Sequence, residues 1–390
     1  MEQERVWREQ IRETLFVPED LPKLDVQVHG QFSPESGVVA ERVSYGTQFG
    51  MRIPAIVYRP EAASQKQCPA LIVVNGHGGD KYSWYSFYTG VLYARAGMVV
   101  LTYDPTGEGE RNRDRKSGTR AHDKVEGPDE LARRLSGLMM TDVMQAVSYL
   151  SQRSEVDSTR IAAAGYSMGS FVLGICGAIE TRLHACVLVG GGNLDGEDEY
   201  WDNSKPMCQG IPYQSLGFLG DRGAALYAMH ASRGPTLVFN GVQDTVVNMP
   251  DTGEPFFADL RVRTVALKGD EVDIFETGFV PDVSHRPFFV TRPVALWLER
   301  HMGFPFCSEA DIRAMGETHI GTWAAAGGVE MDPGYATEER EAGTLALGEG
   351  VPGFERSDLN VYSDAEWEGL KDRLTHESWR RQAKAVQIST

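Results

Sequence analysis

The stretch that decides the fold is RIAAAGYSMG, residues 160–169. The small and apolar residues before Gly165 predict a buried strand, and the apolar run after Gly169 predicts a helix. Residues 165–169 fit the pattern G-x-S-x-G, in which a serine stands at the tip of a sharp strand-to-helix turn. The sequence therefore predicts that Ser167 is a nucleophile, and a plain glycine-rich turn is the alternative.

Short apolar runs alternate with helical patterns on both sides of this turn. Such alternation predicts an α/β fold with a mostly parallel twisted sheet of about eight strands flanked by helices. The first two candidate strands are close enough in sequence to form a hairpin. The candidate strands are residues 41–45, 53–58, 70–74, 98–102, 160–165, 185–189, 236–240 and 264–267.

Changes in sequence texture suggest three parts of the chain. Residues 1–39 form an N-terminal arm with a short amphipathic helix over 4–15, and several prolines follow that helix. Residues 40–302 form the catalytic domain, in which 192–234 is a candidate cap or pocket segment. Residues 303–390 form a C-terminal extension that ends in a charged helix beginning near Ser363, at a sequence with capping-box spacing.

A serine nucleophile needs a histidine base and an acid that orients it, and on such a turn they follow in the order acid, then histidine. Asp244 lies on a turn just after the candidate strand 236–240, so it is the predicted acid, and a plain turn residue is the alternative. His285 lies on a later loop and is the predicted base, with a surface histidine as the alternative. The competing histidines are His230, which precedes Asp244, and His301 and His319, which fall in a helix and in the C-terminal extension.

An oxyanion hole requires backbone N–H groups that point at the reacting carbonyl oxygen. The residue after the nucleophile, Met168, is expected to supply one N–H. The strand 70–74 opens into the glycine-rich loop NGHGG, residues 75–79, and His77 or Gly78 is expected to supply the other. His77 then acts through its backbone, and a tight turn without this role is the alternative.

The charge and the cysteines of the chain limit the classes of molecule that it is expected to bind. With 38 Lys and Arg against 55 Asp and Glu, the formal charge is −17, which argues against nucleic-acid and anionic-membrane partners and weakly favours a neutral substrate. The five cysteines are widely spaced, so neither disulfides nor a metal site are expected, and no cofactor is expected. The charged start of the chain and the absence of long apolar runs predict a cytoplasmic protein, or a secreted one if a leader has been removed.

These motifs together resemble the α/β-hydrolase superfamily, and within it the branch related to acetyl xylan esterase and dienelactone hydrolase. Three further stretches carry the resemblance to this branch: DPTGEGER at 104–111, EVDSTRI at 155–161 and CQGIP at 208–212. Two positions depart from the pattern of many relatives, with Asn75 in place of histidine and Ser170 in place of a third glycine. The resemblance covers residues 40–302. Within 104–111, a buried contact between an arginine and a carboxylate is expected rather than catalysis.

The resemblance implies a serine hydrolase that cleaves carboxylic esters of small acyl groups through an acyl-enzyme. Cleavage of a lactone, amide, peptide or carbon–carbon bond by the same triad is the alternative, and a non-catalytic binding protein is a third. Tyr200, Trp201 and Tyr213 are candidate substrate-pocket residues, with core packing as the other reading. The C-terminal extension could brace the fold, reach the site or build a contact between two copies of the chain.

Overall fold

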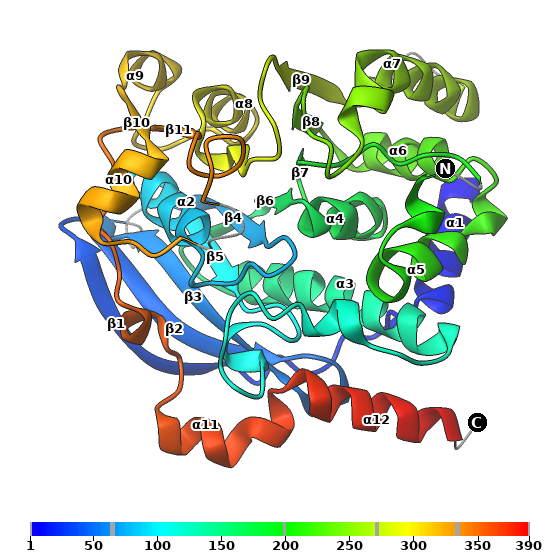
Figure 1. The fold of residues 1–390 in the computed structure, drawn as a ribbon, viewed down its shortest axis with the longest axis horizontal. Helices are drawn as coiled ribbons and strands as arrows, with labels where there is room; N and C mark the ends of the chain where they lie inside the picture. Colours follow the sequence, from blue (N-terminus) through cyan, green and yellow to red (C-terminus); the bar gives the residue numbers. More distant parts are fainter. Residues whose placement is uncertain (1, 63–66, 198–199, 270–272, 332–335, 389–390) are drawn as a thin grey trace.

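A nine-stranded sheet runs through the centre of the molecule (Figure 1). The structure is a computed structural model that describes residues 2–62, 67–197, 200–269, 273–331 and 336–388. The strand order is β1-β2-β3-β5-β4-β6-β7-β8-β9, antiparallel from β1 to β5 and parallel from β5 to β9. The strands are β1 Gln27–Glu35, β2 Val38–Gly46, β3 Arg52–Pro60, β4 Cys68–Val74, β5 Val99–Tyr103, β6 Val156–Tyr166, β7 Ala185–Val189, β8 Thr236–Gly241 and β9 Glu276–Val280.

Helices cover both faces of this sheet, and each face has its own apolar core. One core joins the sheet to α1, α3, α4, α6, α7 and α12, and the other joins it to α2, α8, α9 and α10. The central strands are buried on both faces, which explains their nearly continuous apolar sequences. The helices are α1 Glu2–Thr14, α2 Trp84–Arg95, α3 Asp129–Ser151, α4 Met168–Ile179, α5 Ile211–Gln214, α6 Arg222–Arg233, α7 Met249–Lys268, α8 Arg292–Met302, α9 Glu309–Ala314, α10 Ile320–Gly327, α11 Asp364–Leu370 and α12 His376–Ile388.

The predicted mostly parallel α/β sheet and the hairpin of β2 and β3 are confirmed. The strand predicted at 264–267 is wrong, because these residues form the last turn of α7. Phe257, Leu260 and Thr264 are buried at helical spacing on one face of that helix, so packing overrides the strand preference of this short segment. The two edge strands β1 and β9 were not predicted from the sequence.

The C-terminal extension follows the surface of both layers (Figure 1). Its first part places α9, α10 and a small antiparallel sheet of β10 Glu317–His319 and β11 Leu345–Leu347 beside α2 and α8. Its last part carries α11, which is preceded by Ser363 as N-cap of the predicted capping box, and α12, whose Trp379 is fully buried against α3. None of the described helices combines the length and the apolar character needed to cross a bilayer.

Candidate active site

Ser167 occupies the turn between β6 and α4 in a strained backbone conformation, with φ 55° and ψ −115°. Few residues with a side chain adopt these angles, and such strain is typical of functional sites. Close packing explains the flanking glycines: a Cβ at Gly165 would lie 2.3 Å from the Gly169 carbonyl oxygen, and one at Gly169 would lie 2.1 Å from the Val74 oxygen. The turn therefore has the geometry of a nucleophile elbow, with Ser167 partly exposed at its tip.

Asp244 and His285 form a buried pair at the same edge of the sheet. Asp244 follows β8, and its Oδ2 lies 2.6 Å from His285 Nδ1. The other carboxylate oxygen accepts hydrogen bonds from the N–H groups of Val246 and Val247, at 2.9 and 3.3 Å. The His285 ring stacks on Tyr166, with 4.8 Å between ring centres. These contacts fix the imidazole through Nδ1 and leave its Nε2 for other chemistry.

Ser167 and His285 line the same cavity, so the structure brings all three predicted residues to one place. In the described residues no hydrogen bond joins the Ser167 hydroxyl to His285. Catalytic hydrogen bonds are often long before substrate binds and tighten in the complex. The arrangement is therefore compatible with a triad whose last contact forms on substrate binding.

The competing histidines have other partners. His230 is fully buried in α6 and contacts the Gly174 carbonyl oxygen and the Thr236 hydroxyl at 3.0 and 3.1 Å. His301 pairs with Glu276 at 3.2 Å, and His319 caps the start of α10. None of the three lines the cavity that holds Ser167.

The loop after β4 reaches the cavity, as expected of an oxyanion loop. His77 and Gly78 both line it, and Gly78 has a φ of 78°. Met168 is the first residue of α4, where N–H groups have no partner within the helix. The His77 imidazole makes its contacts elsewhere: its Nε2 lies 2.9 Å from Asp123 Oδ1. The placement leaves Met168, His77 and Gly78 as the candidate backbone donors.

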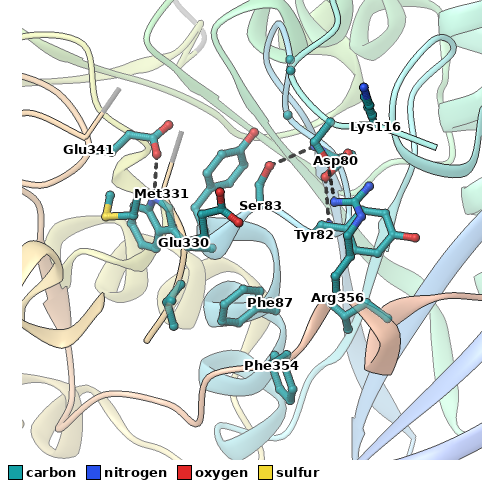
Figure 2. A pocket seen from close by; sticks show the side chains of 18 of the residues that line it. Asp80, Tyr82, Ser83, Phe87, Lys116, Glu330, Met331, Glu341, Phe354 and Arg356 are labelled. Carbon is teal, nitrogen blue, oxygen red and sulfur yellow. Dashed lines mark hydrogen bonds between the residues drawn. The ribbon is translucent and has the colours of Figure 1, made fainter. Parts of the chain in front are cut away.

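The cavity has a volume of about 620 Å³ and combines aromatic and charged side chains. Figure 2 shows Glu330, Met331 and Glu341 on its left and Asp80 and Arg356 on its right. The remaining residues that line the cavity include Tyr82, Ser83, Trp84, Tyr85, Phe87, Arg115, Lys116, Ser117, Tyr166 and Phe354. Such a mixture suits a polar ligand with flat or ring-shaped parts better than a long alkyl chain.

Burial shapes the electrostatics of this cavity. Burial raises the pKa of Asp80, although hydrogen bonding to Ser117 and the positive charge of Arg356 oppose the shift. Arg356 lies over the Tyr82 ring at 3.6 Å and donates hydrogen bonds to the Ser117 hydroxyl at 2.9 Å and to the Arg115 carbonyl oxygen at 2.8 Å. The guanidinium therefore connects the C-terminal extension to the loop around residue 115.

The predicted pocket residues Tyr200, Trp201 and Tyr213 do not line this cavity. The Trp201 ring packs on Phe171 of α4, and its Nε1–H donates to the Asn193 carbonyl oxygen at 2.8 Å. The Tyr213 hydroxyl donates to the backbone carbonyl oxygen of Asp195 at 2.6 Å, and the Tyr200 hydroxyl donates to that of Val246 at 2.8 Å. Trp201 and Tyr213 belong to the core over α4, and Tyr200 is partly buried against that core.

The C-terminal extension instead supplies residues on both sides of the cavity (Figure 2). Glu330, Met331, Glu341, Phe354 and Arg356 all come from it, and the Trp84 Nε1–H donates to Glu341 at 2.6 Å. Reaching the site was one of three roles left open by the sequence. The sequence contains no motif in this region that indicates which role applies.

The 104–111 segment has the structural role that the sequence predicts. Arg111 forms a buried ion pair with Asp142 of α3. Lys81 lies 2.5 Å from Asp104 and 3.0 Å from Glu110, and all three side chains are buried. Glu110 also accepts the backbone N–H groups of residues 361 and 362 at 2.9 and 3.0 Å, which holds the C-terminal extension in place.

A mostly parallel sheet with a nucleophile elbow at its centre and a buried Asp–His pair at the same edge is the architecture of the α/β-hydrolases. The sequence model of the prolyl oligopeptidase family matches residues 81–287, more than half of the chain. The chain belongs to this family. The matched segment contains Ser167, Asp244 and His285.

One curated relative is "Putative hydrolase YtaP" from Bacillus subtilis (strain 168), which is 26% identical over 147 residues. That match covers 35% of this chain and 47% of the relative, so it spans about half of the relative's length.

Two solved structures show the same fold. "Methylesterase BT1017" has a TM-score of 0.58 and 16% identity, with 99% of this chain and 76% of that chain covered. Acetyl xylan esterase 1 from Thermoanaerobacterium sp. JW/SL YS485 has a TM-score of 0.51 and 19% identity, with 76% of this chain and 93% of that chain covered. At these identities the likeness supports the fold, and the first of the two extends over almost the whole chain.

Proposed function

We propose that the protein is a serine hydrolase that cleaves carboxylic esters of small acyl groups. The observation that carries this proposal is the 2.6 Å contact between Asp244 and His285 beside the cavity that exposes Ser167 on a strained elbow. Two structural neighbours, a methylesterase and an acetyl xylan esterase, support an ester substrate.

In the proposed first step, Ser167 Oγ attacks the ester carbonyl carbon while His285 takes the hydroxyl proton. Asp244 holds the imidazole in the required tautomer and stabilises its positive charge. The carbonyl oxygen becomes an oxyanion that receives hydrogen bonds from the N–H of Met168 and from that of His77 or Gly78. His285 then gives the proton to the leaving alkoxide, and the alcohol departs from an acyl-enzyme.

In the second step, water attacks the acyl-enzyme carbonyl and gives its proton to His285. The tetrahedral intermediate collapses, the acid leaves, and the proton returns to Ser167 Oγ. The residues proposed for this chemistry are Ser167, His285 and Asp244, and no cofactor takes part.

The cavity suggests the kind of alcohol that the ester contains. Trp84, Tyr82 and Phe354 offer ring faces, and charged side chains stand among them. Sugar rings bind well to such surfaces, because an aromatic face packs against the ring while polar groups bind its hydroxyls. We propose a small acyl ester of a polar, ring-containing alcohol as the substrate class.

Hydrolysis of p-nitrophenyl acetate, butyrate and octanoate by wild type and by Ser167→Ala tests the ester proposal. We expect turnover that falls from acetate to octanoate and a loss of at least about 10³-fold in Ser167→Ala. The matched control is Ser357→Ala, which removes an exposed hydroxyl from the C-terminal extension. Equal rates in wild type and Ser167→Ala would refute the proposal.

Peptide hydrolysis is the second candidate, because the description of the matching family refers to an oligopeptidase. A prolyl peptide p-nitroanilide assayed beside the esters separates the two functions. A kcat/KM for the peptide above that for acetate would favour the peptidase. If neither substrate turns over and Ser167 does not react with a fluorophosphonate, the protein is a binding protein on a hydrolase scaffold.

A further inference from the structure

A cluster of four metal-ligating side chains lies beside the cavity and takes no part in the proposed hydrolysis. Its members are His77, His122, Asp123 and Cys208, and their ligand atoms all lie within 4.8 Å of one another. They come from three separate places: the loop after β4, the 3₁₀ turn Ala121–Lys124 and the π-helical turn Pro206–Gly210. His122 and Cys208 are buried, and His77 and Asp123 are nearly so.

Four of the six distances between these atoms are close to those of a tetrahedral site, and all six are within 4.8 Å. His77 Nε2 lies 2.9 Å from Asp123 Oδ1 and 3.4 Å from Cys208 Sγ. Asp123 Oδ1 also lies 3.2 Å from His122 Nε2 and 3.5 Å from Cys208 Sγ. Zinc bonds of about 2.0–2.3 Å in tetrahedral geometry place neighbouring ligand atoms about 3.3–3.7 Å apart. Movements of a few tenths of an ångström would therefore bring most of these pairs to coordination distances.

The orientation of His122 points independently to a cation. Its Nδ1 lies 3.3 Å from the Thr106 carbonyl oxygen, which can only accept, so Nδ1 carries the proton. Its Nε2 then presents a lone pair, and this fully buried atom has no hydrogen-bond partner in the described structure. The Asp123 carboxylate oxygen faces it at 3.2 Å, so two electron-rich atoms meet with no proton between them. A metal-ligating histidine usually donates its other ring N–H to a carbonyl or a carboxylate, as His122 Nδ1 does to the Thr106 oxygen, and so presents its free nitrogen to the ion.

Charge and ligand type favour zinc. A cysteine thiolate and a carboxylate together carry the two negative charges that neutralise Zn²⁺ in a buried place, and two neutral imidazoles complete the set. Thiolate with imidazole suits zinc better than magnesium or calcium, which prefer oxygen ligands.

We propose that His77, His122, Asp123 and Cys208 bind one zinc ion. Four protein ligands close the coordination sphere, so the site is structural. The ion connects the loop that carries His77 to the segment around Cys208 and so holds the backbone of residues 77 and 78 in place. Sequence spacing did not indicate this site, because Cys208 is separated from His77 by 131 positions and only the fold brings them together.

Metal content of the full-length protein, with any affinity tag removed, tests the proposal. The protein is stripped with a chelator, incubated with one equivalent of zinc chloride and desalted. We expect about one zinc per chain in wild type and in the control Cys307→Ser, which changes a buried cysteine outside the cluster. Cys208→Ser and His122→Gln are expected to bind zinc at least about 10-fold more weakly in competition with a chromophoric chelator.

Two further readouts do not depend on activity. Zinc is expected to raise the Tm of the stripped wild type and to leave the Tm of Cys208→Ser unchanged. Cobalt in place of zinc is expected to give a thiolate charge-transfer band that Cys208→Ser lacks. Far-UV circular dichroism of each variant checks that it folds.

The proposal is overturned if stripped wild type retains no zinc after refilling and its Tm does not respond. It is equally overturned if folded Cys208→Ser binds zinc as tightly as wild type, since the metal would then lie elsewhere. In the first case the cluster is a hydrogen-bonded network of His77, Asp123 and Cys208. Neither outcome depends on Ser167. A negative result for zinc binding can therefore be distinguished from a negative result for the proposed hydrolase activity.

Discussion

Asp244 has no exposed surface, and both of its carboxylate oxygens are occupied, one by His285 and the other by backbone N–H groups. The backbone N–H groups of its own loop therefore fix the carboxylate independently of its contact with the histidine. The carboxylate is thus held rigidly, and in the part of the chain that the structure describes its one side-chain hydrogen-bond partner is the His285 imidazole. We therefore expect Asp244 to affect catalysis through the orientation and the charge of the His285 imidazole.

Asp244→Asn is expected to lower kcat for p-nitrophenyl acetate by about 10³–10⁴-fold, because an amide at this place favours the wrong imidazole tautomer. The fold should survive, since the side chain keeps its size and an oxygen for the backbone N–H groups. Steady-state kinetics and a thermal melt measure both effects. Asp251→Asn, an exposed aspartate in α7, is the control. An unchanged kcat in Asp244→Asn would exclude this residue as the acid.

His230 makes the stability of the protein sensitive to acid. Burial, helped by the charge of Arg233, lowers its pKa from 6.5 to about 3 in the folded state. Between these values the unfolded chain binds the proton and the folded chain does not, so stability falls as the pH drops below about 6.5. At pH 5 this one group costs about 2 kcal/mol relative to neutral pH.

Urea unfolding at pH 7 and pH 5 measures this effect. His230→Gln keeps hydrogen-bonding groups for the Gly174 oxygen and the Thr236 hydroxyl but cannot titrate. We expect its loss of stability between the two pH values to be smaller than that of wild type by up to about 2 kcal/mol. His301→Gln, at a partly exposed histidine, should behave like wild type. Equal losses in His230→Gln and wild type would contradict the assignment.

Much of the site could be predicted from single residues, because the chemistry restricts them. The G-x-S-x-G turn admits only small residues at 165 and 169, and the order of acid and histidine along the chain selects Asp244 and His285. The pocket could not be predicted in this way. Trp201 and Tyr213 have the composition of pocket residues, but aromatic side chains serve a core equally well.

At the scale of elements, the buried parallel strands could be predicted and the edge strands could not. A central strand such as β4 is apolar along its whole length because both faces are covered. The edge strand β1 contains Gly30 and Pro34 and is largely exposed, so its sequence has neither continuous nor alternating apolar character. The other edge strand, β9, is only partly buried and includes Gly278.

The C-terminal helix α12 packs on α3 through Trp379, whose side chain is fully buried in the same core as the strands. Trp379→Ala is expected to lower the free energy of unfolding by about 3–5 kcal/mol, because it leaves a large cavity. Chemical denaturation measures the loss. Arg381→Ala, at an exposed position of the same helix, should change stability by less than about 1 kcal/mol. A loss below about 1 kcal/mol in Trp379→Ala would mean that α12 does not contribute to this core.

At the scale of the whole molecule, the sheet and the C-terminal extension share the construction of the site. The carboxyl ends of β6 and β8 position Ser167 and Asp244, which is where α/β sheets collect their chemistry. The C-terminal extension follows α8 and contributes residues to both sides of the cavity. This division explains why the sequence located the candidate residues at the strand ends but not the cavity-lining residues that the extension supplies.

The most direct test of the account is to find which residue reacts with a fluorophosphonate. Wild-type protein is labelled, digested and analysed by mass spectrometry, with Ser167→Ala and Asp244→Asn alongside. The account predicts one label per chain, on the peptide that contains Ser167, with slower labelling in Asp244→Asn and none in Ser167→Ala. Labelling at another serine, or no labelling of folded wild type, would contradict the assignment of Ser167 as the nucleophile.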